Sequence, residues 1–244
     1  MLVYKPSGIL GTCVANQYKK NLNKKKVCIC GKLDPMAEGQ LLLLFDNDCK
    51  NMNKHLIHDK TYVFKILWGF STDTDDTFGL INKIHNINNV NINNTYINKH
   101  LKEFIGVYNQ KFHKYSAKTV FNNKNEKHTL WKWSSLNRLE EIQIPEKKVI
   151  VDYIKILNTE KKKFNNIKTE IINTINKINT NNSNFRKDLI LEQWTQLNIN
   201  NVYITTFEAK VSSGYYIRQF INDFGNKSGL YGIALNINRT IIHI

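Results

Sequence analysis

Residues 31–39, with the sequence Gly-Lys-Leu-Asp-Pro-Met-Ala-Glu-Gly, hold the side chain best suited to chemistry. Pro35 has a fixed φ and restricts the backbone of Asp34, while the flanking glycines allow backbone shapes that other residues resist. The apolar run at 41–45 predicts a buried strand directly after this loop. Asp34 is therefore expected on a stiff loop at the edge of a sheet, where a carboxylate can serve catalysis or ligand binding. An Asp-Pro turn without a chemical role explains the same residues.

The charge of the chain is strongly positive. Its 244 residues include 35 Lys and Arg against 20 Asp and Glu, which gives a formal net charge of +15. Such an excess favours a polyanionic partner, most often nucleic acid, because basic side chains release counterions when they bind phosphates. A basic composition that serves only solubility is the alternative. No secretory signal or basic amphipathic helix stands out, so we expect an intracellular, cytoplasmic chain without membrane binding, and a nuclear location stays open.

The cysteines and acidic residues do not form a metal-binding pattern. Cys28 and Cys30 make one Cys-x-Cys pair, and no second pair has the spacing of zinc ligands. The acidic segment 72–79 has Phe78 where a calcium-binding loop needs glycine. We therefore expect no metal, and cysteines that stay reduced.

Hydrophobic periodicity predicts the elements that would position Asp34. Strands are expected at 27–30, 41–45, 60–71, 80–85, 149–157 and 202–212, and helices at 12–22, 95–105, 130–139 and 215–224. A helical hairpin is expected as an insertion at about 158–201. The mixed order of strands and helices predicts one α+β domain over residues 1–244, built on a mixed or mostly antiparallel sheet.

Five segments, in the same order along the chain, resemble the TruB-type tRNA pseudouridine synthases. They are residues 5–8, 31–39, 60–62 with 72–79, 115–118 and 213–218. This resemblance implies the pseudouridine-synthase fold, in which helices flank a mixed, mostly antiparallel sheet around a central RNA cleft. It also implies an isomerase that flips uridine out of the T-arm of tRNA, typically uridine 55, without metal or cofactor. We expect a monomer.

By the same resemblance, the catalytic residues are Asp34, Tyr62 and Arg218. Asp34 would attack the sugar or the base, or take a proton from the ribose, and Arg218 would pair with its carboxylate. On its helix Arg218 lies away from the apolar stripe, so a solvent-facing side chain is the alternative. The resemblance places four residues in substrate binding, namely Ile29, Tyr62, Tyr216 and Ile237. It assigns a supporting role to Lys5, Pro6 and Lys60.

The chain departs from the family's usual pattern at several positions. Ile29 stands where the family has a histidine that fills the gap left by the flipped base, and it would act as an apolar wedge. Phe112 and His113 stand where two prolines are usual, and Asn238 replaces the first of two arginines. We expect no C-terminal PUA domain for RNA binding. A catalytically silent RNA-binding or tRNA-folding module is the alternative function, and a guide-RNA-dependent relative is a third possibility.

Overall fold

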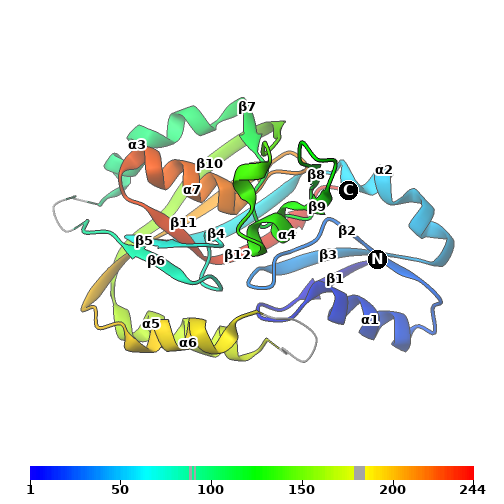
Figure 1. The fold of residues 1–244 in the computed structure, drawn as a ribbon, viewed down its shortest axis with the longest axis horizontal. Coiled ribbons are helices and arrows are strands. Elements are labelled where there is room, and N and C mark those ends of the chain that lie inside the picture. The colour runs from blue at the N-terminus through cyan, green and yellow to red at the C-terminus, as the bar shows by residue number, and fades with distance from the viewer. Residues whose placement is uncertain (88–89, 91, 179–184) are drawn as a thin grey trace.

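The computed structural model describes residues 1–87, 90, 92–178 and 185–244 of the chain. Eight of the described strands form one sheet, in the order β1-β3-β12-β4-β11-β10-β7, with β2 paired to β3 (Figure 1). Neighbouring strands are antiparallel, except that β3 and β12 are parallel. Their bounds are β1 Leu2–Lys5, β2 Val27–Cys30, β3 Glu38–Phe45, β4 Lys60–Trp68, β7 Gly106–Lys111, β10 Glu146–Lys163, β11 Asn201–Val211 and β12 Gly232–Ile242. The predicted α+β class with a mixed, mostly antiparallel sheet is confirmed.

Helices and two short hairpins surround this sheet. The helices are α1 Gly11–Asn21, α2 Met52–Leu56, α3 Asn94–Leu101, α4 Leu130–Ser135, α5 Phe164–Asn176, α6 Lys187–Gln196 and α7 Ile217–Ser228. The hairpins pair β5 Phe70–Thr72 with β6 Ile81–Ile84, and β8 Thr119–Phe121 with β9 Lys127–Thr129. Within the described residues, no helix is long and apolar enough to cross a membrane.

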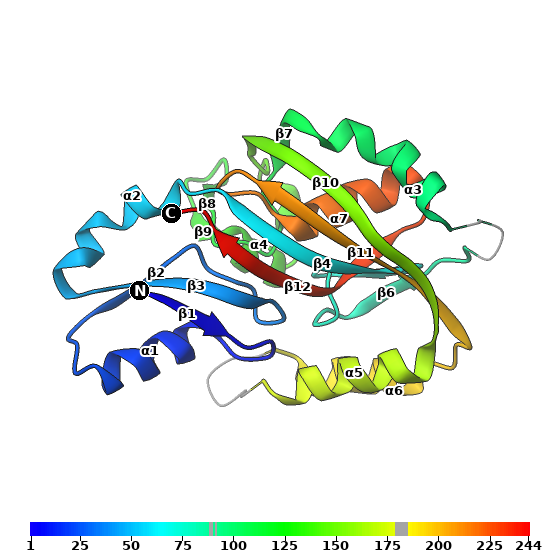
Figure 2. The same cartoon turned by 180° about the vertical axis from the view of Figure 1, so that it is seen from behind.

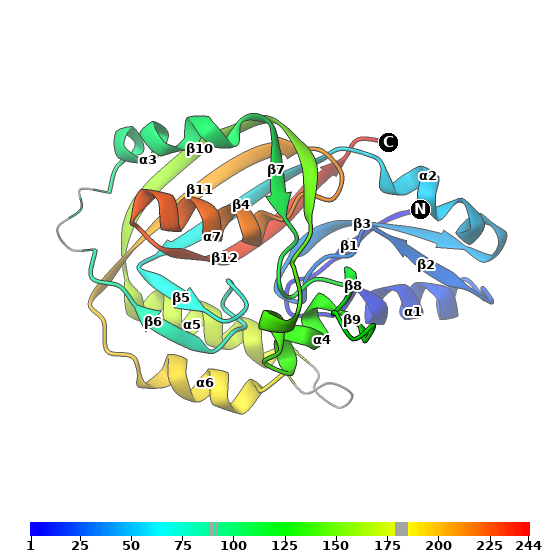
Figure 3. The ribbon, with the colours of Figure 1, turned by 45° about the horizontal axis from the view of Figure 1, so that its top comes forward.

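The main core lies between α7 and the middle strands of the sheet (Figure 3). Phe64 of β4 stacks on Phe207 of β11, with ring centroids 5.3 Å apart, and Phe220 of α7 packs edge-on to Phe64 at 5.9 Å. All three side chains are fully buried. The predicted apolar stripe of the helix at 215–224 therefore packs on the centre of the sheet, which fixes where the N-terminus of α7 lies.

A smaller core holds the N-terminal part of the chain together. Val3, Val14 and Leu41 belong to a separate buried cluster formed by α1, β1 and β3. Figure 2 shows this part beside β12. It joins the larger sheet where Glu38 and Gly39 of β3 pair with Asn238 and Arg239 of β12. Because residues 31–37 connect β2 to β3, the loop that carries Asp34 lies at the junction of the two parts.

Glycines explain two differences from the predicted elements. The strand expected over 60–71 is broken at Gly69, whose φ of +84° turns the chain between β4 and β5. The helix expected to end at Phe224 continues to Ser228, so that boundary was wrong. Gly225 lies inside α7, at a point where an added Cβ would come within 2.9 Å of the Gly232 backbone nitrogen. This glycine permits close packing of α7 on β12.

Two further boundaries differ from the predictions. The helix expected over 130–139 ends at Ser135, and Asn137 follows with a left-handed φ of +52°. The helical insertion begins later than residue 158, because β10 continues to Lys163 and pairs with β11 up to Asn201. The strand pairing therefore extends through the basic run at residues 161–163. Helices α5 and α6 then form the hairpin, and residues 179–184 between them lie outside the described residues.

We expect the change Gly39→Ala to disrupt the junction of the two parts. Gly39 has a φ of +110°, and a Cβ there would lie 2.3 Å from the Arg239 carbonyl oxygen. Gly106→Ala is a matched control, because Gly106 has a φ of +94° and nothing within 4 Å of the added Cβ. Backbone strain alone costs about 1–2 kcal/mol, so the Gly39 variant should lose several kcal/mol and the control about that strain. Urea unfolding measures both, and equal losses would contradict this account of the junction.

Candidate active site

The loop at residues 31–37 is anchored along its length. The Gly8 backbone N–H donates to the Pro35 carbonyl at 3.0 Å, and the Ser7 hydroxyl donates to the Met36 carbonyl at 2.7 Å. Met36 is buried, whereas the Asp34 side chain is 35% exposed. The Ala37 N–H closes a turn onto the Asp34 carbonyl at 3.1 Å. The loop therefore presents one partly exposed carboxylate on a fixed backbone.

Lys5 is the buried anchor of this loop. Its side chain is fully buried, and its Nζ donates to the carbonyls of Pro6 and Pro35 at 3.1 Å each and to that of Ala37. Burial lowers the pKa of Lys5 to about 8, against the effect of the nearby Asp34 carboxylate. Lys5, which was expected to have a supporting role, thus contacts the loop directly, whereas Pro6 only accepts one of the Lys5 hydrogen bonds. Because each carbonyl buried without a partner would cost about 1–3 kcal/mol, Lys5 contributes to holding the loop in place.

Lys60 is buried elsewhere in the fold. Its Nζ donates to the carbonyls of Leu56 and His58, which lie just before β4, and burial lowers its pKa to about 8. These hydrogen bonds tie the start of β4 to the end of α2. They do not reach the loop that carries Asp34.

Arg218 lies at the second position of α7 and meets the Asp34 loop. Its side chain is buried, with only 5% exposed, which excludes the solvent-facing alternative. One terminal nitrogen donates to Asp34 Oδ1 at 2.7 Å, and the other donates to Asp76 Oδ2 at 3.0 Å. The carbonyls of Thr74 and Tyr115 accept two more hydrogen bonds, at 2.9 and 3.3 Å. One guanidinium therefore joins α7, the Asp34 loop, the acidic loop and the segment at 115–118.

Asp76 is a functional candidate that the sequence did not single out. It lies in the acidic loop at 72–79, is almost fully buried, and also accepts hydrogen bonds from the Thr74 hydroxyl and the Phe78 N–H at 2.7 and 2.9 Å. Burial raises the pKa of Asp76 to about 6, against the opposing effect of Arg218. The only sequence signal for Asp76 was its place in one of the five family-like segments.

The predicted base-binding residues lie on two elements beside this network. Tyr62 of β4 pairs with Arg239 of β12, and Ile237 pairs with Phe64, so Tyr62 and Ile237 are diagonal neighbours in the sheet. Both are largely buried, at 8% and 3% exposure. Adjacent strands therefore bring together one aromatic and one aliphatic side chain, as a surface for stacking a flat ring would require.

Tyr216 lies just before α7, and Ile29 lies in β2, just before the Asp34 loop. The backbone of Tyr216, just before α7, is held by the Gln110 side chain, which accepts from its N–H at 2.9 Å and donates to its carbonyl at 3.0 Å. Ile29 lies in β2 opposite Leu43 and packs into the smaller core against α1. In this structure Ile29 fills part of that core, and its role as a wedge stays a prediction.

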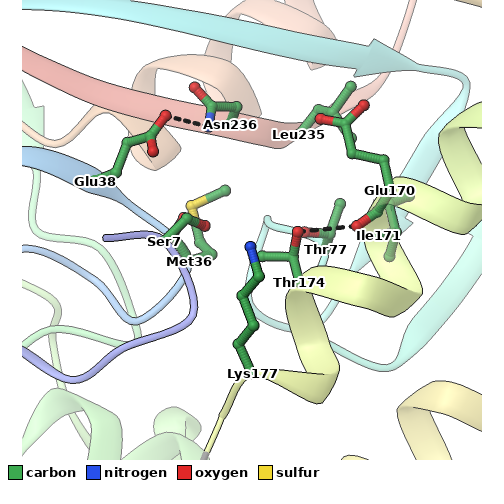
Figure 4. Close-up of a pocket in the computed structure, with 10 residues that line it drawn as sticks. All are labelled: Ser7, Met36, Glu38, Thr77, Glu170, Ile171, Thr174, Lys177, Leu235 and Asn236. Carbon is green, nitrogen blue, oxygen red and sulfur yellow. Dashed lines mark hydrogen bonds between the residues drawn. The ribbon is translucent and has the colours of Figure 1, made fainter. Parts of the chain in front are cut away.

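A cavity of about 230 Å³ lies next to the Asp34 loop but does not include Asp34 or Arg218 (Figure 4). Met36 and Glu38 line one wall, Asn236 of β12 a second, and Thr174 of α5 with Lys177, the residue after that helix, a third. The helical insertion therefore borders the junction of the two parts. The Asp34–Arg218–Asp76 network lies outside the lining of this cavity.

Metal-ligand clusters are absent from the described part of the chain, where no three His, Cys, Asp or Glu side chains come together to hold an ion. The four cysteines are free thiols. What the site offers is a partly exposed carboxylate oriented by a buried guanidinium, and this arrangement suits nucleophilic attack or proton abstraction.

We expect Asp76→Asn to change how stability depends on pH. Because the folded pKa of Asp76 lies above the ordinary value of an aspartate, its contribution to stability is present below about pH 4 and is lost as pH rises through about 6. The Asn variant should therefore gain stability relative to the wild type by about 2 kcal/mol or more between pH 4 and pH 7. Urea unfolding at the two pH values measures this difference. A parallel pH dependence in both proteins would contradict the raised pKa.

Comparison with known proteins identifies relatives of this chain. A sequence model of the TruB family pseudouridylate synthase (N terminal domain) matches residues 19–174. The tRNA pseudouridine synthase B of Malacoplasma penetrans is 26% identical over 97% of this chain and 82% of its own length. That of Fusobacterium nucleatum is 27% identical over 98% of this chain and 66% of its own length.

Solved structures show the same fold. The crystal structure of a Cbf5-Nop10-Gar1 complex contains a chain that matches with a TM-score of 0.55 and 17% identity, over 99% of this chain and 48% of that chain. This chain thus spans about half the length of that protein. The structural match confirms the predicted pseudouridine-synthase fold. Because the family model covers well over half of the sequence, this chain belongs to the TruB family of pseudouridylate synthases.

Proposed function

We propose that this chain isomerises uridine to pseudouridine in tRNA, most specifically at uridine 55 of the T-loop. The observation that carries this proposal is the Asp34–Arg218 ion pair at 2.7 Å, formed between two of the family-like segments. The relatives named tRNA pseudouridine synthase B support tRNA as the substrate. We also propose that the chain acts in the cytoplasm, on the basis of the same relatives.

The reaction breaks the bond between N1 of uracil and C1′ of the ribose, turns the base, and joins C5 to C1′. C5 loses its proton and N1 gains one, so the product has the same atoms as the substrate. Asp34 can act at C1′ or on the base as a nucleophile, or it can take a proton from the ribose, and both routes need an accessible carboxylate. The 35% exposure of the Asp34 side chain provides this access, while Arg218 holds one of its oxygens.

Tyr62 and Ile237 would receive the flipped base. Extruding a nucleotide costs a few kcal/mol, and stacking on an aromatic ring returns about 1–3 kcal/mol per base. A ring on β4 next to an aliphatic side chain on β12 can therefore offset much of that cost. The net charge of +15 favours the approach of the RNA backbone, because phosphate contacts dominate nucleic-acid affinity.

Asp34→Asn should abolish pseudouridine formation while tRNA binding persists. Asn keeps the size of the side chain but cannot act as nucleophile or base, so we expect the rate to fall by at least about 10³-fold. The measurement is incubation with unmodified tRNA, followed by carbodiimide labelling and primer extension to locate pseudouridine. Asp48→Asn is the matched control, because Asp48 is exposed and lies outside the network.

The same experiment separates the two candidate functions. Pseudouridine at position 55 from the wild type and from the Asp48 variant, and none from the Asp34 variant, supports the enzyme. A wild-type protein that binds tRNA but forms no pseudouridine at any position would contradict the proposal and favour the RNA-binding or tRNA-folding module.

A further inference from the structure

A buried histidine lies beside the catalytic network without belonging to it. His113 follows β7, is fully buried, and uses both ring nitrogens. Nε2 lies 3.0 Å from Asp75 Oδ2, and Nδ1 accepts a hydrogen bond from the Tyr115 backbone N–H at 3.1 Å. A nitrogen that accepts from an N–H carries no proton, so the ring proton belongs on Nε2, where it is donated to Asp75. The geometry therefore assigns one neutral tautomer.

The charges around this ring agree with a neutral imidazole. Burial, together with the positive charge of Arg218, lowers the pKa of His113 to about 4, against the effect of Asp75. The Asp75 carboxylate is also contacted by Lys114 Nζ at 3.4 Å and by the amide of Asn222 at 3.0 Å. Lys114 and Arg218 thus supply the positive charge near Asp75. A further positive charge on the His113 ring is not needed to balance the carboxylate.

The hydrogen bond from Tyr115 to His113 connects the ring to the catalytic arginine. A side chain that accepts from the backbone N–H two residues later closes a turn of the kind that Asp and Asn form. That turn orients the Tyr115 carbonyl, which accepts from the Arg218 nitrogen at 3.3 Å. The same nitrogen donates to Asp34 at 2.7 Å. His113 is therefore separated from Asp34 only by the Tyr115 peptide and the guanidinium.

We propose that His113, held as the neutral Nε2–H tautomer by Asp75, is a positioning residue that sets the Tyr115 carbonyl against Arg218 and so orients Asp34. Asp75 and Asp76 are adjacent in one loop, so this link also ties the Tyr115 turn to the second partner of Arg218. The consequence for rate rests on the proposed pseudouridine synthase activity. The tautomer and the turn do not depend on it.

Two amide variants of His113 test its two hydrogen bonds one at a time, because each variant keeps only one of them. In His113→Asn, the amide oxygen takes the place of Nδ1 and can accept from the Tyr115 N–H, but Asp75 loses the hydrogen bond from position 113 and keeps those from Lys114 and Asn222. In His113→Gln, the amide nitrogen takes the place of Nε2 and can donate to Asp75, but the turn is lost. Both variants lose one buried hydrogen bond, so a purely structural role predicts that they behave alike.

The first measurement is the single-turnover rate of pseudouridine formation per folded protein, with the dissociation constant for tRNA measured alongside. Small displacements of catalytic groups can cost up to about 10²-fold in rate. We expect His113→Gln to lose about 10- to 100-fold with tRNA affinity within about twofold, and His113→Asn to recover most of the rate. Equal rates for the two variants would overturn the positioning role.

The second measurement is ¹⁵N NMR of the histidine rings at pH 7, with the His113 signals assigned by their loss in His113→Gln. We expect a protonated Nε2 and an unprotonated Nδ1. A proton on Nδ1, or a doubly protonated ring, would overturn the inference whether or not the protein is active. If the wild type forms no pseudouridine while the NMR spectrum shows the expected tautomer, the proposed function fails and the geometric assignment stands.

Discussion

The buried guanidinium of Arg218 is the interaction on which the rest of the site depends. A charged group taken out of water is costly unless it is paired and hydrogen-bonded, and losing one partner of a buried pair typically costs about 3–5 kcal/mol. The two terminal nitrogens of Arg218 are paired with two carboxylates and hydrogen-bonded to two backbone carbonyls. Each partner comes from a loop. Three loops therefore pack against the N-terminus of α7, where their oxygens surround one cation.

The two carboxylates on Arg218 have different surroundings, and this difference gives them different tasks. Asp76 is buried at 4% side-chain exposure, whereas the Asp34 side chain is 35% exposed. Asp76 therefore serves to hold the guanidinium, and Asp34 is left open to a substrate. Lys5 fixes the other side of the Asp34 loop through backbone carbonyls. Rigid backbone on one side and a fixed cation on the other are the conditions for a preorganised catalytic group.

Local patterns predicted many elements of the fold but missed β7, β8, β9 and α2, and the contacts between elements were beyond local reasoning. Alternating apolar residues predicted β4, and the stripe ending in Phe224 predicted α7, because each pattern reports which face is buried. The burial of Arg218 could not be seen on its helix, since its carboxylate partners lie 184 and 142 residues away in the sequence. Asp76 was missed for the same reason, and so was the hydrogen bond between His113 and Asp75, which are 38 residues apart. The family-like segments made up for part of this missing long-range information, since they predicted that Asp34 and Arg218 lie in one site.

A double-mutant cycle between Asp34 and Arg218 tests the central claim most directly. The single-turnover rates of pseudouridine formation would be measured for the wild type, Asp34→Glu, Arg218→Gln and the double variant. Glu keeps a carboxylate, so we expect this variant to retain a measurable rate. If Arg218 acts by orienting the carboxylate at position 34, the two losses are strongly non-additive, and the double variant is little worse than the more damaging single one. If the fold-losses in rate of the two single variants multiply in the double variant, the two residues act independently. That result would contradict the orienting role of Arg218.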